Sequence, residues 1–408
     1  MKRINNKIWL LAILLLPTVL MAQIIEPQAG DTTFYKTLIP ETKQTLLKNM
    51  SMIANMRFAL RNEFTDGEFT GSRFANEQFR LELKGKVHDK VYFRFRDRYT
   101  RAQTSESVDN LSRSVDLAFI RVDATDKFSI TAGKMCADWG GYEFDANPID
   151  IYEYSDIIEY ADNFLSGVGA SYKINSNHQA TIQILDSRTK TFSELYGAQP
   201  NFEESKVPLA AVVNWRGSFF NGKFNTIWAY AFHNEAKNIA KDQAAGMSYL
   251  SLGNQLNLGK FKVEYDFNWS QEDLDRSGII SEQVNNAPDT SVNYPYALEK
   301  TQYNSHWIHL NYRVNEKVNL ALVVMIDLAN WQDNVDENYP GFDHHIRTTY
   351  GFIPTFEYYP FKDLNLRFYV NYVGRSYQYS DYAQSRLGVK DKNTGRFAIG
   401  FVSPLGIF

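Results

Sequence analysis

Hydrophobic and polar residues alternate with a period of two over most of the chain beyond residue 56. In the stretch FKVEYDFNW at 261–269, apolar or aromatic residues occupy every odd position and polar residues every even position. The stretches VYFRFRDR at 91–98 and LNLRFYVNY at 364–372 repeat this pattern. A period of two indicates β-strands with one apolar and one polar face. Segments of about ten such residues are typical of strands that cross a membrane in a barrel.

Counting these segments gives the expected number of strands. The pattern predicts an all-β fold, a transmembrane antiparallel β-barrel of about sixteen strands, and an even number is usual for bacterial barrels. The predicted strands lie at 57–64, 74–86, 89–100, 115–123, 127–133, 164–174, 178–186, 207–216, 223–232, 246–257, 260–269, 304–313, 316–328, 346–358, 363–374 and 395–407.

The connections between these segments alternate between short and long. Turn-rich links of two or three residues occur at 87–89, 124–126, 175–177, 257–259 and 315–316. The connections between them are long and polar, at 101–114, 134–163, 187–206, 233–245, 270–303, 329–345 and 375–394. Short turns at one end and long loops at the other are expected of an outer-membrane barrel.

The N-terminal residues predict export. Basic residues precede an apolar run at 8–21, and Ala22 offers a cleavage site, so residues 1–22 are interpreted as a signal peptide. The run is short for a membrane-spanning helix, which is the alternative. Residues 23–56 are interpreted as a periplasmic lead-in with a possible short helix at 41–56, because apolar residues recur there at spacings of three and four. The barrel is assigned to 57–408.

Composition narrows the class of protein further. Aromatic residues make up 15% of the chain, yet the mean hydropathy is −0.39, a combination that suits a barrel with lipid outside and water inside. A net charge of −4 gives no bias toward nucleic acid, and the single cysteine, Cys136, excludes an internal disulfide framework. Motifs for catalysis, for a cofactor or for a paired-cysteine metal site are absent, so we expect neither an enzyme nor a cofactor.

The connection at 133–165 differs from the others in its composition. It contains one lysine, Lys134, and many aromatic residues, including Trp139, Tyr142, Tyr152 and Tyr154. Connections of this length are uncommon and are usually functional where they occur. We expect this third long loop to fold into the pore. Its eight carboxylates are Asp138, Glu143, Asp145, Asp150, Glu153, Asp156, Glu159 and Asp162.

Basic residues concentrate on one face of the first three predicted strands. If the apolar residues of these strands face lipid, the basic residues line the lumen. Opposed charges across a constriction would create a transverse field, so the loop carboxylates are expected to face this basic wall. The alternative is a set of lumen salt bridges to neighbours such as Glu63 and Glu82, without a role in transport. The basic wall consists of Arg57, Arg61, Arg80, Lys84, Arg94, Arg96 and Arg98.

Parts of the long loop resemble a known family. The sequence WGGYE at 139–143, NPID at 147–150 and Tyr154 look like the inward loop of the phosphate-selective porin O and P family. The resemblance implies a homotrimer of sixteen-stranded barrels in the outer membrane of a Gram-negative bacterium, in contact with lipid and lipopolysaccharide. It also implies passage of small polar solutes, and recognition of the terminal Phe408 by the barrel-assembly machinery.

The acidic loop departs from what the family name suggests. Phosphate selectivity in such pores resembles an arginine ladder, here Arg94, Arg96 and Arg98, leading to a lysine-rich constriction, whereas this loop is acidic. We therefore predict a general diffusion porin with weak ion preference. The alternatives are a channel specific for an anion such as phosphate or for a sugar, a closed barrel that acts as an adhesin or enzyme, and a soluble secreted β protein.

Overall fold

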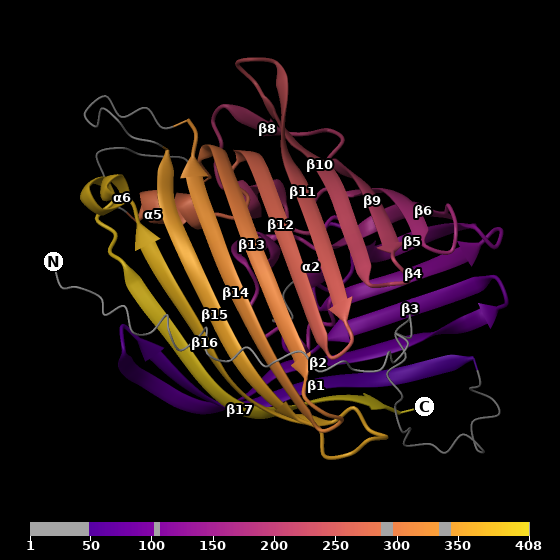
Figure 1. Cartoon of the computed structure of the whole chain (residues 1–408). Helices are drawn as coiled ribbons and strands as arrows, with labels where there is room; N and C mark the ends of the chain where they lie inside the picture. Colours follow the sequence, from indigo (N-terminus) through magenta and orange to yellow (C-terminus); the bar gives the residue numbers. More distant parts are fainter. Residues whose placement is uncertain (1–48, 102–106, 287–296, 334–343, 408) are drawn as a thin grey trace. The chain divides into compact units, whose positions relative to one another are not determined.

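The computed structural model describes residues 49–101, 107–286, 297–333 and 344–407, and its strands form one antiparallel sheet. Sixteen strands form a closed ring, because β1 pairs with β2 on one side and with β17 on the other (Figure 1). The seventeenth strand, β8, is three residues long and pairs with the end of β10. The predicted sixteen-stranded antiparallel barrel is therefore confirmed.

The strands run in chain order around the ring. The first half contains β1 (Met50–Thr65), β2 (Glu68–His88), β3 (Val91–Arg98), β4 (Val115–Asp123), β5 (Phe128–Cys136), β6 (Phe164–Lys173), β7 (His178–Asp186) and β9 (Leu209–Phe219), with β8 (Phe202–Glu204) outside it. The second half contains β10 (Phe224–Asn238), β11 (Gln243–Leu258), β12 (Phe261–Leu274), β13 (Glu299–Arg313), β14 (Val318–Trp331), β15 (His345–Tyr358), β16 (Arg367–Tyr379) and β17 (Lys392–Gly406).

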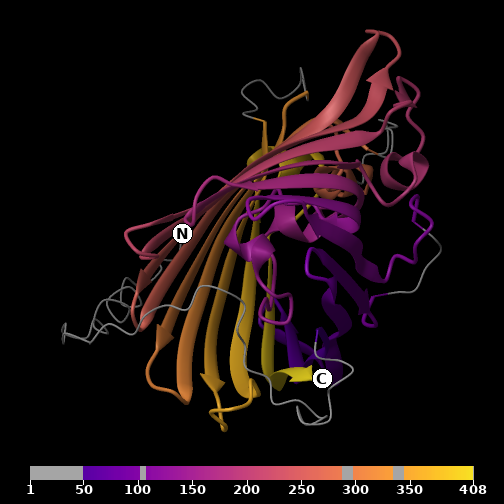
Figure 2. The same ribbon diagram turned by 90° about the vertical axis from the view of Figure 1, so that its right-hand side faces the viewer.

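Short helices occur within the long connections; α5 and α6 lie at one end of the barrel, and short turns join strands at the other end (Figures 1 and 2). None of the helices in the described part of the chain is long and apolar enough to cross a membrane. The described helices are α2 (Tyr142–Asp145), α3 (Asp156–Tyr160), α4 (Phe192–Tyr196), α5 (Ile279–Asn285) and α6 (Asp381–Arg386).

The two faces of the sheet have opposite character, as β10 illustrates. Its aromatic residues Trp228, Tyr230 and Phe232 are 41–43% exposed, whereas the alternating residues Ala229 and Ala231 are 5% exposed or less. Large aromatic side chains on the outer surface suit contact with lipid, and those near strand ends suit the membrane interface. Buried polar and charged side chains occupy the inner face of other strands, so the polar residues of the alternating pattern point into the barrel.

The first strand begins earlier than predicted. Residues 50–56, which were assigned to the lead-in, belong to β1 and pair with β2 and β17. Their helix-like spacing is overridden because both neighbouring strands would otherwise have unpaired backbone groups. Residues 1–48, which include the predicted signal peptide, and the terminal Phe408 lie outside the described residues.

The seam between β17 and β1 leaves no room for a side chain at Gly400. A Cβ atom there would lie 2.1 Å from the backbone oxygen of Phe58 and 2.9 Å from the Cα of Ala59. We expect Gly400→Ala to destabilise barrel closure by about 1–3 kcal/mol, as overpacking does elsewhere. The measurement is the temperature at which the folded band is lost in heat-modifiability gels.

Gly71→Ala is the matched control for this substitution. Gly71 also lies in a barrel strand, β2, but an added Cβ would meet no atom within 4 Å. Equal transition temperatures for Gly400→Ala and Gly71→Ala would contradict the role assigned to the seam.

Candidate functional site

The connection between β5 and β6, residues 137–163, contacts side chains from many strands of the barrel. From β1, Arg57 donates hydrogen bonds to the carbonyl oxygens of Ile149 (3.1 Å) and Ile151 (2.5 Å). From β12, Asp266 accepts one from the backbone N–H of Glu143 (2.7 Å). The first half of the loop is thus bound to strands that are far apart around the ring.

Acidic residues near the start of the loop pair with one arginine. Arg216 of β9 forms ion pairs with Asp138 (2.7 Å) and Asp145 (2.8 Å). Asn214, two residues earlier on the same strand, donates a hydrogen bond to the carbonyl oxygen of Asp138 (3.0 Å). These contacts fix the loop where it leaves β5.

Acidic residues in the middle of the loop pair with arginines of the last three strands. Asp150 forms an ion pair with Arg367 of β16, and Glu153 pairs with Arg396 of β17 (3.1 Å). Each of these carboxylates is thus paired with a guanidinium group of the barrel wall. Truncation of either partner would leave a charge without its counterion.

Asp156 is the most extensively bound carboxylate of the loop. It pairs with Arg347 of β15 and with Arg375 of β16 (2.8 Å), and its N–H donates to Asp327 of β14 (3.1 Å). Arg375 also pairs with Asp327 (2.9 Å). Removing one partner from a buried network of this kind costs about 3–5 kcal/mol, because it leaves an uncompensated charge.

Asp162 binds near the end of the loop. Its carboxylate accepts hydrogen bonds from the N–H (2.5 Å) and hydroxyl (2.6 Å) of Thr189, and it lies 3.8 Å from Arg276. Six of the eight predicted loop acids are therefore within ion-pair distance of an arginine; the two others are Glu143 and Glu159.

Glu143 is fully buried and faces other carboxylates. It accepts hydrogen bonds from the N–H (2.6 Å) and hydroxyl (2.7 Å) of Ser155. Burial raises the pKa of its carboxyl well above the usual range, and the neighbouring charges of Asp266 and Asp327 act in the same direction. A neutral Glu143 is consistent with a structural role and adds no charge to the interior.

Glu159 differs from the other seven acids. It is accessible to solvent and forms no ion pair with any described residue. Surrounding protein raises the pKa of its carboxyl, as does the charge of Glu153, while Arg98 and Arg375 oppose the rise. Glu159 is thus the loop acid whose charge state can alter the interior.

The glycines of the WGGYE motif permit close approach to the wall. A Cβ on Gly141 would lie 2.5 Å from the Cγ of Asp266, and one on Gly140 would lie 2.2 Å from the Cβ of Phe144. Gly253 of β11 shows the same restriction from the opposite side, 2.8 Å from Asp266 Oδ1. Gly141 is therefore explained by packing of the loop backbone onto β11 and β12, and Gly140 by packing against Phe144 within the loop.

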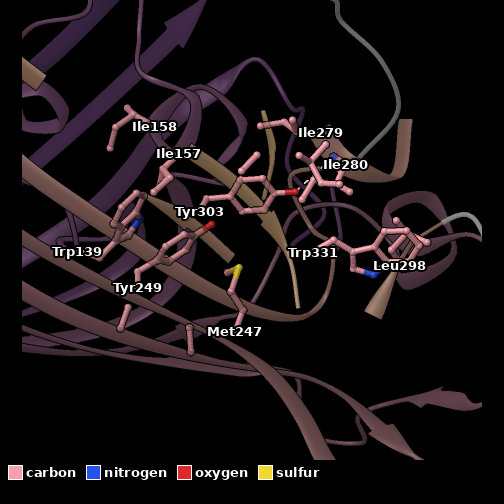
Figure 3. Close-up of a cluster of buried hydrophobic side chains, with 14 of the residues drawn as sticks. Trp139, Ile157, Ile158, Met247, Tyr249, Ile279, Ile280, Leu298, Tyr303 and Trp331 are labelled. Carbon is pink, nitrogen blue, oxygen red and sulfur yellow. Dashed lines mark hydrogen bonds between the residues drawn. The ribbon is translucent and has the colours of Figure 1, made fainter. Parts of the chain in front are cut away.

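The aromatic residues of the loop belong to its packing core. Trp139 is fully buried and stacks on Tyr249 of β11 with ring centroids 4.2 Å apart. Ile157 and Ile158 of α3 and Tyr303 of β13 belong to the same cluster (Figure 3). The cluster also includes residues of α5 and α6, so the helices of three connections share one apolar core.

The three tyrosines predicted with Trp139 pack against a second cluster, around Trp307. Tyr154 also packs against the cluster of Trp139, and Tyr152 lies against Tyr369 of β16 with ring centroids 4.8 Å apart. These side chains attach the loop to β13–β17.

The residues of the predicted basic wall form ion pairs with neighbouring carboxylates. Arg94 and Lys84 lie 3.1 and 3.6 Å from Glu82. The two basic-wall residues of β1 share one carboxylate, that of Glu77. Its oxygens lie 2.9 Å from Nε of Arg57 and 3.7 Å from Nε of Arg61. Arg61 also pairs with Glu63 at 2.7 Å.

One carboxylate of this wall was missed in the sequence. Asp116 is fully buried and lies 3.6 Å from Arg80, 3.3 Å from Arg96 and 2.7 Å from Arg98. It occupies a register shift at which Arg96 pairs with Leu117 and Asp97 with Val115. Such a bulge can turn a residue, here Asp116, toward the opposite face of the sheet from the one that simple alternation predicts.

The ion pairs of the loop acids differ from those predicted. The acids were expected to face the basic wall of the first strands, but their arginine partners lie on β9, β15, β16 and β17 and at Arg276. Meanwhile three arginines of β2 and β3 share one carboxylate, Asp116, so positive charge exceeds negative charge around it. These three are Arg80, Arg96 and Arg98.

Comparisons with known proteins agree with this architecture. DcaP, an outer membrane channel of Acinetobacter baumannii, aligns with a TM-score of 0.58 at 11% identity over 86% of this chain and 96% of its own. An anion-selective porin from Comamonas acidovorans aligns with a TM-score of 0.55 at 9% identity, over 87% of this chain and 99% of its own. OprB of Pseudomonas putida aligns with a TM-score of 0.55 at 11% identity, over 90% of this chain and 96% of its own. At these identities the similarity concerns the fold.

Sequence comparison identifies the family. No curated protein sequence matches the chain significantly. A profile of the family described as phosphate-selective porin O and P matches residues 59–401, which is most of the chain. The chain therefore belongs to the phosphate-selective porin O and P family, and it is an outer-membrane porin through which solutes diffuse passively.

Proposed function

We propose that this porin is a general diffusion pore for small hydrophilic solutes, with a modest preference for anions. The observation that carries the proposal is the imbalance of charge inside the barrel. Arg80, Arg96 and Arg98 surround a single carboxylate, Asp116, whereas most acids of the long loop are matched by arginines. An excess of one sign of charge along a pore favours ions of the opposite sign.

Residues 137–163 are proposed to form the constriction. In support, their hydrogen bonds and ion pairs involve strands from β1 to β17, and their partners are polar residues of the inner face. A loop bound to several sides of a closed barrel narrows its lumen. The transverse field is weaker than the acidic sequence suggests, because arginines cancel most of the loop charges.

Strong phosphate selectivity is not part of the proposal. The one lysine of this region, Lys134, is buried and lies 3.0 Å from Asp109, so the loop contributes no accessible cation. Multiple cations converging on one anion would be needed to replace its hydration. The neighbour from Comamonas acidovorans is described as anion-selective, and that property is proposed here in a weaker form.

The remaining expectations from sequence are proposed on the family membership and on composition. Residues 1–22 would direct export and be removed, the barrel-assembly machinery would recognise the C-terminal residue, and the mature chain would form a homotrimer in contact with lipid and lipopolysaccharide. The proposed role is transport without enzymatic activity or a cofactor.

Reversal potentials in planar bilayers test the proposal. Under a salt gradient we expect chloride to be modestly more permeant than potassium, with conductance that rises linearly with salt. Liposome swelling should show uptake of small neutral, anionic and cationic solutes with a size limit. Strong block by phosphate, or saturation by one anion, would instead indicate a specific channel.

Removing positive charge from the wall of β2 and β3 should reduce the anion preference. In the double variant Arg94→Gln and Arg98→Gln, we expect the chloride-to-potassium permeability ratio to fall by roughly a factor of two, because two positive charges are lost while Glu82 and Asp116 remain. The reversal potential measures this ratio directly.

Arg73→Gln is the matched control. Arg73 lies near the tip of the β1–β2 hairpin and its side chain is 66% exposed. It should leave the permeability ratio unchanged. An equal effect of both changes would indicate that overall charge, rather than the wall of β2 and β3, sets the preference.

The anion preference should increase as the pH falls into the acidic range. The pKa of Glu159 is raised, so its carboxyl loses its charge at a higher pH than an ordinary glutamate, which removes a negative charge from the interior. Glu159→Gln should show the larger chloride permeability already at neutral pH. If the variant keeps the pH dependence of the parent, another group is responsible.

A further inference from the structure

The connection between β12 and β13 folds into the barrel and packs against the loop 137–163. Its helix α5 places Ile279 and Ile280 in the apolar cluster that also contains Ile157 and Ile158 of α3. These four side chains are at most 4% exposed. Buried residues of β11, β13 and β14 belong to the same cluster, so α5 lies inside the ring of strands. Two connections that are far apart in the sequence thus share one core.

Tyr303, on the inner face of β13, contacts this core and α5 together. Its hydroxyl donates a hydrogen bond to Asp275 Oδ1 (2.7 Å) and accepts one from the N–H of Ile280 (3.4 Å). Its ring is 2% exposed and belongs to the apolar cluster. In Figure 3 the ring lies between the two labelled isoleucines of α3 and the two of α5. One side chain of the barrel wall therefore holds α5 beside the cluster that contains α3.

Asp275 joins the two ends of the connection to each other. Its buried carboxylate accepts hydrogen bonds from the N–H (2.8 Å) and the hydroxyl (2.6 Å) of Ser281. The N–H of Asp275 donates to the carbonyl oxygen of Leu298 (2.8 Å), and the N–H of Leu298 donates to the hydroxyl of Ser281 (3.0 Å). Hydrogen bonds to an ionised group are among the stronger ones, so α5 is held firmly at its base.

A second contact between the connection and the loop is ionic. The buried guanidinium of Arg276 lies 3.8 Å from Asp162, near the end of the loop. The same group is held by Glu235 of β10 (2.6 Å) and by the carbonyl oxygen of Ser187 (2.9 Å). The connection therefore contacts the loop twice, through the apolar cluster at α3 and through an ion pair beyond its C-terminal end.

The position of α3 depends on such contacts. It has five residues and no side-chain hydrogen bond at its N-cap, and helices this short are not stable alone. Ile157 and Ile158 are packed on the core, whereas Glu159 and Tyr160 are exposed. Because Asp156 pairs with arginines of the inner face, the exposed side of α3 meets the water of the lumen.

We propose that the described residues of this connection, 275–286 and 297–298, form a brace that positions the constriction, with Tyr303 and Ile280 as positioning residues. The inference rests on the proposed function, in which residues 137–163 form the constriction. While α3 is docked on the core, it restricts the passage. When α3 leaves the core, the passage widens. The brace thus determines how often the pore visits a wider state, and through it the conductance and the size limit.

Single-channel recordings of the full-length protein in planar bilayers test the brace. In Ile280→Ala we expect brief transitions to a larger conductance level, with the time spent there increased about tenfold over the parent, because truncation of a buried isoleucine weakens the shared core. Tyr303→Phe keeps the ring and removes the hydroxyl, and the loss of its hydrogen bonds should increase that time about three- to tenfold. Liposome swelling should show that larger solutes enter through Ile280→Ala than through the parent.

Two control variants separate positioning from a general loss of stability. Ile53→Ala also truncates a buried isoleucine, but Ile53 lies on β1 and belongs to none of the apolar clusters of the described residues. It should lower the transition temperature in heat-modifiability gels without adding a wider level. Ile280→Leu preserves the side-chain volume, so it should keep the conductance of the parent.

The outcomes distinguish the brace from the pore. Folded Ile280→Ala and Tyr303→Phe channels with the conductance levels of the parent would overturn the brace and leave the diffusion pore intact. A wider level that appears equally in Ile53→Ala would also overturn it, because loosening of the barrel as a whole would then be the cause. Absence of ion conductance in the parent would overturn the proposed pore itself.

Discussion

Closure of the sheet is the constraint on which the rest of this structure depends. Backbone N–H and C=O groups cannot be left unpaired in lipid, where each costs several kcal/mol, so a membrane-spanning sheet must have no free edge. The pairing of β1 with β17, from Ile53 opposite Gly406 to Thr65 opposite Thr394, removes the last two edges. This requirement explains why residues 50–56 join the barrel despite a helix-like spacing, and why Gly400 has no room for a side chain at the seam.

Closure also determines where polar groups can lie. With aromatic residues turned toward lipid, charged residues collect on the inner face, where they need partners because desolvation of a lone charge is costly. Carboxylates of the loop provide many of these partners. The pairs of Asp156 with Arg347 and Arg375, and of Asp138 and Asp145 with Arg216, bind a segment that has little regular secondary structure of its own. The acidic residues of the loop, which suggested that it would repel anions, thus serve mainly to bind the loop to the barrel wall.

The candidate site was predictable only in part. Alternation predicts that Arg94 and Arg96 share one face, since side-chain direction follows from strand geometry, and in the structure they pair with Glu82 and Asp116. The same rule could not place Asp116, because a bulge breaks the alternation at that residue. A lone aspartate in the otherwise apolar segment VDLAFI was the available signal. The partners of the loop acids were also out of reach, because Arg216 is 78 residues from Asp138 and Arg396 is 243 from Glu153.

The sequence by itself determined the class of fold, the number of strands and the polarity of the two faces. These features depend on local periodicity, which backbone geometry alone sets. Tertiary structure decided which arginine meets which loop acid, that β1 begins at Met50, and that Glu159 is exposed while Glu143 is buried. Contacts across a barrel depend on how each strand is shifted against its neighbours around the whole ring. No short stretch of sequence specifies the total of these shifts.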